Sequence, residues 1–463
     1  MTAIPTITEA SRLIRERKLS PVELTAQCLS RIETLDGRLN AFILLLADEA
    51  MEQAKRAEAE IAAGQWRGAL HGIPLGLKDN IAYKGYPTTG HSAVLKDRIS
   101  GADAHVTQRL REAGAVILGK LATWEFAVGG PSHDLPWPPA RNPWNTDRDP
   151  GGSSSGSAVA VAAGLCLGAL GTDTGGSVRY PSSFCGIAGH KPTYGLVSRR
   201  DLLPLSFSFD CVGPMCWTAE DCGLVLDAIA GHDPLDIASA NTFMKKTDAS
   251  AGLSGLRVGV IRNFHEEDQP ANAEVSAAFR DSLAVLKDLG ADLRDVVLPP
   301  LQLFQSTALS ISRADAFAIY GKALRKTPEM FGEIGRRRIV AGAFVTASDY
   351  VNAQRQRLRL SDIIAAIMRD VDILVCPTAS EPATLLGGDR NRIGGSNHFC
   401  RPFSLTGQPA LSVCSGYSAD GLPLSLQIAG RHFEDELVLL AGTAYERATT
   451  HRARRPAIVS QGA

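Results

Sequence analysis

The spacing of apolar residues divides the chain into a helical start and a longer part in which helices and strands alternate. Between residues 7 and 63 the apolar positions recur at the spacing that places them on one face of an α-helix. One helix is predicted to begin at Ser20-Pro21, because serine is a good N-cap and proline is tolerated in the first turn. Its buried face is expected to carry the apolar residues Leu24, Cys28, Ile32 and Leu35.

From residue 69 onward, short apolar strands alternate with Gly/Pro turns and helices. A helix over 106–113 followed by a strand over 115–118 is the alternation typical of an α/β sheet. Further strands are predicted over three segments, 256–261, 372–376 and 410–414. Asp420-Gly421 then predicts a hairpin to a strand over 424–428, and a helix over 434–448 closes the chain.

No internal repeat or low-complexity linker interrupts this pattern, which favours one large α/β domain over residues 1–463. Its expected parts are an N-terminal helical region (1–65), a core with the motifs described below (69–232), a peripheral, largely helical region (233–370) and a C-terminal part of the same sheet (371–463). The basic run Arg336-Arg337-Arg338 in the third part is most simply a solvated helix face.

The composition argues against several classes of protein. The 463 residues include 48 Lys+Arg and 49 Asp+Glu, so the net charge is 48 − 49 = −1, without the basic excess typical of nucleic-acid binders. No apolar run is long enough for a membrane span, and no secretory signal is visible. The nine cysteines form no Cys-x-x-Cys pair and no His cluster has metal-ligand spacing, so we expect reduced thiols, no metal and a cytoplasmic location. Glycine is in excess, at 44 of 463 residues against a usual share of roughly 7%.

Three segments carry candidate chemistry, and the first runs from Gly72 to Asn80. Its apolar residues alternate with small ones, as on a half-buried strand. Lys78 falls on the face that carries Pro74 and Gly76, which leaves room around its amine. Taken alone, a lysine in this position is more often a surface residue at the end of a strand.

The second segment is the Gly/Ser stretch 151–157, which leads into a run that is apolar on every side from Ala158. This predicts a buried helix whose N-terminus, with its free N–H groups, favours developing negative charge. Gly152 to Gly156 also match G-x-S-x-G, the nucleophile elbow of α/β-hydrolases. That alternative requires a strand directly before the motif, but residues 142–150 have the composition of a loop, and no downstream histidine is a compelling triad partner.

The third segment runs from Gly171 to Pro181. Gly175 and Gly176 precede Ser177 and permit a tight loop whose N–H groups converge on one point. Acyl transfer needs such donors beside its nucleophile, because they hold the oxyanion. A lone Gly-Gly-Ser is a weak signal, since most such tripeptides are turns.

The three segments, in this order, resemble the amidase signature family, and the resemblance covers nearly the whole chain. Further matching stretches are Gly119-Lys120 to Phe126-Ala127, Arg141 to Trp144, Cys185 to Gly195, Asp210 to Met215, Cys376 to Thr378, Leu405 to Ala410 and Gly421 to Gly430. The resemblance implies a single α/β/α domain with a mixed, twisted central sheet covered by helices. It also implies an amidohydrolase that needs no metal or cofactor.

The resemblance places the family's Ser–cis-Ser–Lys triad on Ser177, Ser153 and Lys78. Ser177 is then the nucleophile, Ser153 follows a cis peptide bond and relays the proton, and Lys78 is the base. The implied oxyanion hole consists of the N–H groups of Thr174, Gly175, Gly176 and Ser177. These roles are chemically reasonable, because a serine needs a base and a lysine can serve as one only when burial favours its neutral form.

The chain departs from the family's pattern at three places, Ala122-Thr123-Trp124, His190 and Ser404. The first bears on a loop that usually borders the substrate pocket. Ala127 and Gly129, within the stretch 127–131, are expected to contribute to the wall of that pocket. Trp137 and the segment 207–209 fit a pocket wall and a structural anchor equally well.

Two functions follow from the resemblance. One is a stand-alone amidohydrolase that cleaves a C–N bond of a small, fairly apolar amide, anilide or carbamate, the last being a urethanase activity. The other is the glutaminase (A) subunit of a tRNA-dependent amidotransferase, which works with other chains. The altered segment 122–124, the Gly129-Gly130 loop and the compact length favour the hydrolase. A catalytically dead binding protein is disfavoured, because all three triad positions are intact. We expect a small-molecule substrate, no nucleic acid or membrane partner, and a homodimer, since related hydrolases are often dimers.

Overall fold

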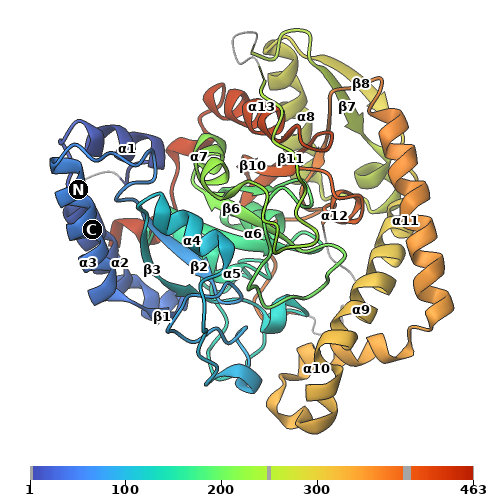
Figure 1. The fold of residues 1–463 in the computed structure, drawn as a ribbon. Coiled ribbons are helices and arrows are strands. Elements are labelled where there is room, and N and C mark those ends of the chain that lie inside the picture. The colour runs from blue at the N-terminus through green and yellow to red at the C-terminus, as the bar shows by residue number, and fades with distance from the viewer. Residues whose placement is uncertain (1–3, 248–251, 389–397, 462–463) are drawn as a thin grey trace.

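A mixed sheet of eleven strands runs through the part of the chain that the computed structural model describes, residues 4–247, 252–388 and 398–461 (Figure 1). The strand order is β1-β3-β2-β4-β6-β5-β10-β11-β9-β7-β8. The strands are β1 (Phe42–Leu45), β2 (Pro74–Lys78), β3 (Val116–Leu121), β4 (Gly168–Asp173), β5 (Ala188–Lys191), β6 (Cys211–Cys216), β7 (Arg257–Ile261), β8 (Asp292–Val296), β9 (Ile373–Pro377), β10 (Ala410–Tyr417) and β11 (Pro423–Ala429).

The two ends of the sheet are partly parallel and its middle is antiparallel. Strand β2 pairs in parallel with β3 and β4, and β7 pairs in parallel with β8 and β9. The strands from β4 through β6, β5, β10 and β11 to β9 pair antiparallel. The hairpin predicted at Asp420-Gly421 joins β10 to β11. The mixed α/β sheet confirms the predicted fold class.

Helices cover both faces of the sheet. They are α1 (Ile7–Arg15), α2 (Pro21–Leu39), α3 (Ala47–Ala62), α4 (His105–Glu112), α5 (Ser155–Ala162), α6 (Arg179–Cys185), α7 (Ala219–Ile229), α8 (Ala273–Asp288), α9 (Leu301–Lys326), α10 (Glu333–Val340), α11 (Ala347–Ile367), α12 (Arg401–Leu405) and α13 (Asp435–Arg447). The side chain of His190 in β5 points to α13, where its Nε2 lies 3.1 Å from an oxygen of Asp435. The preceding position along β5, Gly189, faces Ser182 of α6. Because neighbouring strand residues point to opposite faces, α6 and α13 lie on opposite sides of the sheet.

Several local predictions are confirmed. Helix α2 begins at Pro21, and the side chain of Ser20 accepts hydrogen bonds from the N–H groups of Val22 and Glu23. The four apolar residues expected on its inner face are buried. Every residue of α5 is buried, as its uniformly apolar sequence predicts.

Two local predictions are wrong. Strand β2 is buried along its whole length rather than half-buried, because it lies inside the sheet between β3 and β4 and beneath helices. The segment 7–63 is not helical throughout, because residues 42–45 form β1, which pairs antiparallel with β3. Residues 171–173 form the end of β4, which is not among the predicted strands. Glycine at position 171 fits the strand there, since an added Cβ would lie 2.7 Å from the side chains of Met215 and Ser154.

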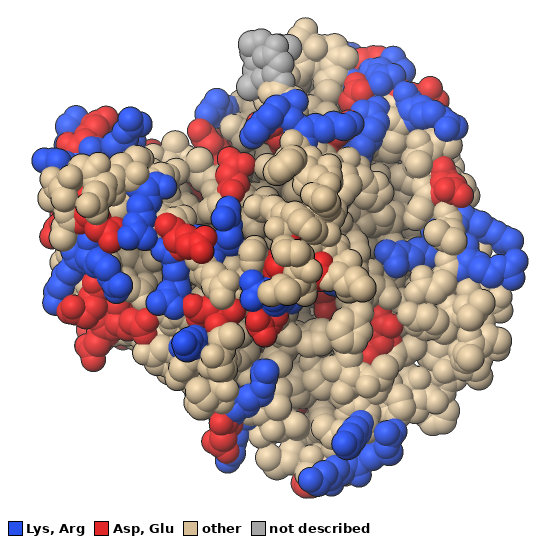
Figure 2. Space-filling view, viewed as in Figure 1, with Lys and Arg blue, Asp and Glu red and all other residues tan. Residues whose placement is uncertain are grey.

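Residues 233–370 supply the sheet strands β7 and β8 together with α8 to α11. Figure 1 shows α9, α10 and α11 as a helical layer beside the sheet, at the right of the view. Acidic and basic side chains are interspersed over the face seen in Figure 2. None of the helices in the described residues combines the length and apolar character that crossing a membrane requires. All nine cysteines are buried and free of disulfides.

Candidate active site

Lys78 ends strand β2 and is fully buried. Its Nζ lies 2.7 Å from Ser153 Oγ and 2.8 Å from Thr172 Oγ1, the latter on the neighbouring strand β4. Asn80 Nδ2 also donates to Thr172 Oγ1, at 3.0 Å. The parallel pairing of β2 and β4 therefore brings the amine to the edge where β4 leads into the Gly-Gly-Ser loop.

Burial changes the acidity of this amine. Desolvation lowers the pKa of Lys78 to about 7, although the negative charges of Asp210 and Asp173 act in the opposite direction. A substantial neutral fraction is thus present near neutral pH, and a neutral amine can accept a proton.

The segment before α5 places Ser153 against Lys78. The peptide bond between Gly152 and Ser153 is cis. The next residue is fixed to β4 on both sides, because Ser154 Oγ accepts from the N–H of Thr172 and donates to its carbonyl, each at 3.2 Å. Ser154 N–H also donates to the carbonyl of Ser177, at 3.2 Å, which joins the two serine-bearing segments.

This geometry argues against the nucleophile-elbow alternative. Ser154, the central serine of the G-x-S-x-G match, is buried and engaged with the backbone of β4. Residues 142–150 contain no strand, so the strand that an elbow requires is missing from this described segment.

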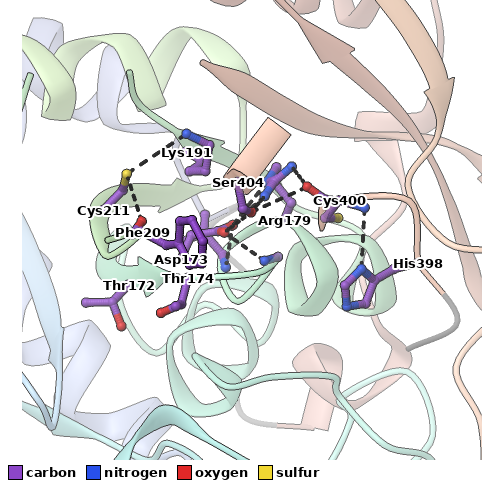
Figure 3. Close-up of polar contacts among 12 residues, drawn as sticks. Thr172, Asp173, Thr174, Arg179, Lys191, Phe209, Cys211, His398, Cys400 and Ser404 are labelled. Atoms are coloured by element: carbon purple, nitrogen blue, oxygen red, sulfur yellow. Dashed lines mark hydrogen bonds and ion pairs between the residues drawn. The ribbon is translucent and has the colours of Figure 1, made fainter. Parts of the chain in front are cut away.

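The loop 174–178 carries Ser177 and is held by a buried ion pair between Asp173 and Arg179 (Figure 3). Arg179 Nε and Nη2 each donate to one carboxylate oxygen, at 3.0 Å, which is the bidentate arrangement. The same carboxylate accepts the N–H groups of Gly176 at 2.7 Å and Val178 at 3.2 Å. Burial alone would raise the pKa of Asp173, but the charge and hydrogen bonds of Arg179 hold it well below its ordinary value.

Arg179 also ties this loop to the C-terminal part of the chain. Its Nη1 donates to the carbonyl of Cys400 at 2.9 Å and to Gln427 Oε1 at 2.7 Å. Its Nη2 donates to Ser404 Oγ at 2.7 Å (Figure 3). Ser404, one of the three departures from the family's pattern, therefore belongs to this network.

A cavity of about 540 Å³ opens next to the loop. Ser177, Thr174 and Gly175 line it, together with Ala127 and Gly129, as expected from the sequence. Ser153 and Lys78 lie behind this surface and are fully buried. Lys78 and Ser153 are thus paired out of contact with solvent, and Ser177 lines the cavity.

The expected oxyanion hole is arranged somewhat differently from the prediction. The N–H of Gly176 already donates to Asp173, so it orients the loop in this structure. For Gly175 and Ser177 no hydrogen bond from the N–H to another described residue is present, which leaves these two donors available beside the cavity.

Only some of the residues expected to form the pocket wall line the cavity. The whole stretch 127–131 lines the cavity, as does Trp124 from the altered segment 122–124. Trp137 and residues 207–209 do not line it. The ring of Trp137 packs against His91, and Phe209 is buried under the guanidinium of Arg357, so these aromatics are structural anchors.

Several residues of the site were not singled out by sequence reasoning. Thr172, Asp173 and Arg179 lie within the third segment, where two charged residues among small and apolar ones could have indicated a buried pair. Arg313 and Arg401 lie on helices α9 and α12, far along the chain from the three segments, and no local sequence pattern marks them.

The basic run 336–338 is only partly the solvated face that its composition predicts. Arg336 and Arg337 are exposed, but Arg338 is half-buried and lines the cavity, because α10 turns this side toward the site. Within the described residues no three His, Cys, Asp or Glu side chains are grouped so as to hold a metal ion.

Comparison with known proteins shows similarity over the whole site and nearly the whole chain. A family model described as Amidase matches residues 23–439. The A subunit of the glutamyl-tRNA(Gln) amidotransferase of Moorella thermoacetica is 38% identical, with 97% of each chain covered.

Solved structures are also similar to this chain over nearly its whole length. One, described as a vestigial protein complex that reveals the evolutionary origins of an s-triazine catabolic enzyme, has a TM-score of 0.89 and 30% identity, covering 96% of this chain and 98% of that one. A bacterial aryl acylamidase of the amidase signature enzymes has a TM-score of 0.86 and 26% identity, covering 98% and 99%.

Removal of one partner of the buried pair Asp173–Arg179 is expected to destabilise the protein strongly. R179L leaves Asp173 buried without its counter-charge, so it should lower the free energy of unfolding by about 3–5 kcal/mol. R447L removes an exposed pair with Glu220 and should cost less than about 1 kcal/mol. Urea unfolding of both variants measures this, and similar losses for the two would contradict the assignment.

Proposed function

The chain belongs to the amidase family, and on that premise we propose that it hydrolyses the C–N bond of a small amide through a covalent intermediate on Ser177. The observation that carries the proposal is the buried pair of Lys78 Nζ and Ser153 Oγ, 2.7 Å apart, behind a serine that lines the cavity. Such an arrangement fits a base and a proton relay for a nucleophilic hydroxyl.

In the proposed reaction, Ser177 Oγ attacks the amide carbonyl carbon. Its proton passes to Ser153, whose own proton passes to the neutral amine of Lys78. The N–H groups of Gly175 and Ser177 stabilise the oxyanion, since such donors act where charge develops. The C–N bond then breaks, the proton returns through Ser153 to the leaving nitrogen, and water hydrolyses the acyl-enzyme ester to the acid.

Glutamine is the first candidate substrate. Several relatives of this chain are amidotransferase A subunits, and the alignment with the one from Moorella thermoacetica covers 97% of both chains. This supports the second of the two functions expected from the sequence, the glutaminase of an amidotransferase, over the first.

A stand-alone amidase is the second candidate. The altered segment 122–124 supports it, because Trp124 from this segment lines the cavity and lies against Gly152, where an added Cβ would be 2.2 Å from the indole ring. The similarity in structure to an aryl acylamidase points the same way. Small amides, anilides and carbamates are the substrates to test for this candidate.

The pH dependence of the reaction should report the state of Lys78. The base must be neutral in the free enzyme, and its pKa is lowered to about 7. We expect kcat/KM to fall about tenfold per pH unit below that value and to level off above it. A pH–rate profile checks this, and a flat profile between about pH 5.5 and 8.5 would argue against Lys78 as the base.

K78A should lower the rate by about 10²–10⁴-fold while the protein stays folded.

A fluorophosphonate probe should label Ser177. Its Oγ forms the bond to phosphorus, fluoride leaves and the hydroxyl proton passes to Ser153, so the reaction uses the same activation as amide hydrolysis. Mass spectrometry of the labelled peptide identifies the site, with S177A as the unlabelled control. S154A should still be labelled, and modification of Ser154 in the wild-type chain would restore the elbow alternative.

Substrate assays distinguish the two candidates. If the chain is the glutaminase of an amidotransferase, ammonia release from glutamine should rise on addition of the partner subunits and glutamyl-tRNA, and anilides and carbamates should remain intact. Turnover of an aryl anilide or aryl carbamate by the lone chain, without turnover of glutamine, would instead establish the stand-alone amidase.

A further inference from the structure

Among the described residues, more basic than acidic side chains line the cavity beside Ser177. Four arginines line it, namely Arg148, Arg313, Arg338 and Arg401, whereas Asp149 is the one acidic residue in the wall formed by the described residues. Arg148 is paired with Asp420, which does not line the cavity, at 3.6 Å. Arg313 and Arg401 reach the same wall from helices α9 and α12.

Arg401 is the arginine next to the reacting groups. It begins α12, and its Nη1 lies against the oxyanion loop, since a Cβ added to Gly175 would be 3.0 Å from it. Its Nε is buried and has no hydrogen-bond partner among the described residues. A buried guanidinium donor without an acceptor is costly, and a bound anion would satisfy it.

Neighbouring arginines add to this charge. Burial lowers the pKa of Arg401 to about 10, and the positive charges of Arg338 and Arg313 contribute to the shift. The residue is still a cation at neutral pH. Helix α12 packs against α9, which carries Arg313, so the two guanidinium groups reach the cavity from adjoining helices.

The rest of the wall limits what the anion can be attached to. Leu205, Ala308, Leu309, Ala316 and Ile334 give the cavity an apolar side, and its volume of about 540 Å³ suits a small molecule. A molecule with a short hydrocarbon chain and a negatively charged end would contact both the apolar side chains and the arginines.

We propose that Arg401 and Arg313 form an anion subsite that selects amides whose carbon chain ends in a carboxylate. The inference rests on the proposed function, because it names the substrate class for the same cavity. Planar guanidinium groups match a carboxylate through paired hydrogen bonds, whereas a neutral chain leaves their donors unsatisfied. The proposal applies to glutamine and to other acidic amides alike, so it does not depend on which candidate substrate is correct.

Two primary amides that differ in one group test the subsite. Glutaramate (the monoamide of glutaric acid) carries a carboxylate where pentanamide carries a methyl group, and both release ammonia on hydrolysis. We expect wild-type kcat/KM to be at least about tenfold higher for glutaramate. R401Q and R313Q should each lower kcat/KM more on glutaramate than on pentanamide and so remove most of that preference, and R401K should retain part of it.

R337Q is the matched control. Arg337 lies on α10 beside Arg338, but it is exposed and paired with Glu333. Its removal takes away one positive charge without altering the cavity wall, so the preference for glutaramate should stay within about twofold. Equal loss of both activities in R401Q would show that Arg401 supports the loop rather than the substrate, and would overturn the proposal.

Binding measurements separate failure of the subsite from failure of the proposed reaction. In S177A, which lacks the nucleophile, isothermal titration calorimetry should show glutaramate binding at least about tenfold more tightly than pentanamide, with the difference lost in S177A/R401Q. Equal affinities would contradict the subsite. Tighter binding of glutaramate without turnover by the wild-type chain would support the subsite and contradict the hydrolytic function.

Discussion

The site depends above all on the buried ion pair between Asp173 and Arg179. Strand β4 ends with the aspartate and helix α6 begins with the arginine, so the loop between them has both ends anchored to one contact. The carboxylate also accepts two N–H groups of the loop, which fixes the direction of the remaining donors. Such a pair contributes little net stability compared with apolar packing, because desolvation opposes the attraction. Its main effect here is geometric, since it sets the position of Ser177 against the cavity.

Burial has a second effect, which is chemical. The amine of Lys78 is enclosed by β2, β4 and the segment before α5, and the loss of water brings its pKa near neutrality. Two acids nearby, Asp173 and Asp210, oppose this shift, and each is itself engaged in hydrogen bonds with the loops around the site. Desolvation exceeds their attraction, so the same packing that hides the base also makes it a base.

Local patterns in the sequence are sufficient for the fold class and for the central residues, while long-range contacts decide the remainder. The uniformly apolar run from Ala158 predicts the buried helix that follows the Gly/Ser stretch, and the resemblance in three motifs predicts that Ser177, Ser153 and Lys78 form one site. Strand β4 is not among the predicted strands, because its residues are small, and only the neighbouring strands show that they are paired. Arg313 and Arg401 cannot be foreseen, since their shared cavity is formed by helices far apart in the sequence.

The position of β5 in the sheet has a consequence for how the chain is made. Strand β5 is complete by Lys191, but its partner β10 begins at Ala410, and the partners of Arg179 other than Asp173 lie at Cys400 and beyond. During synthesis all three proposed reacting side chains therefore emerge long before the segments that order them. Until then the half-sheet ends in an unpaired edge, which is the kind of surface that associates with other chains. The edge of β5 and the network around Arg179 are therefore complete only once the C-terminal segments have been added.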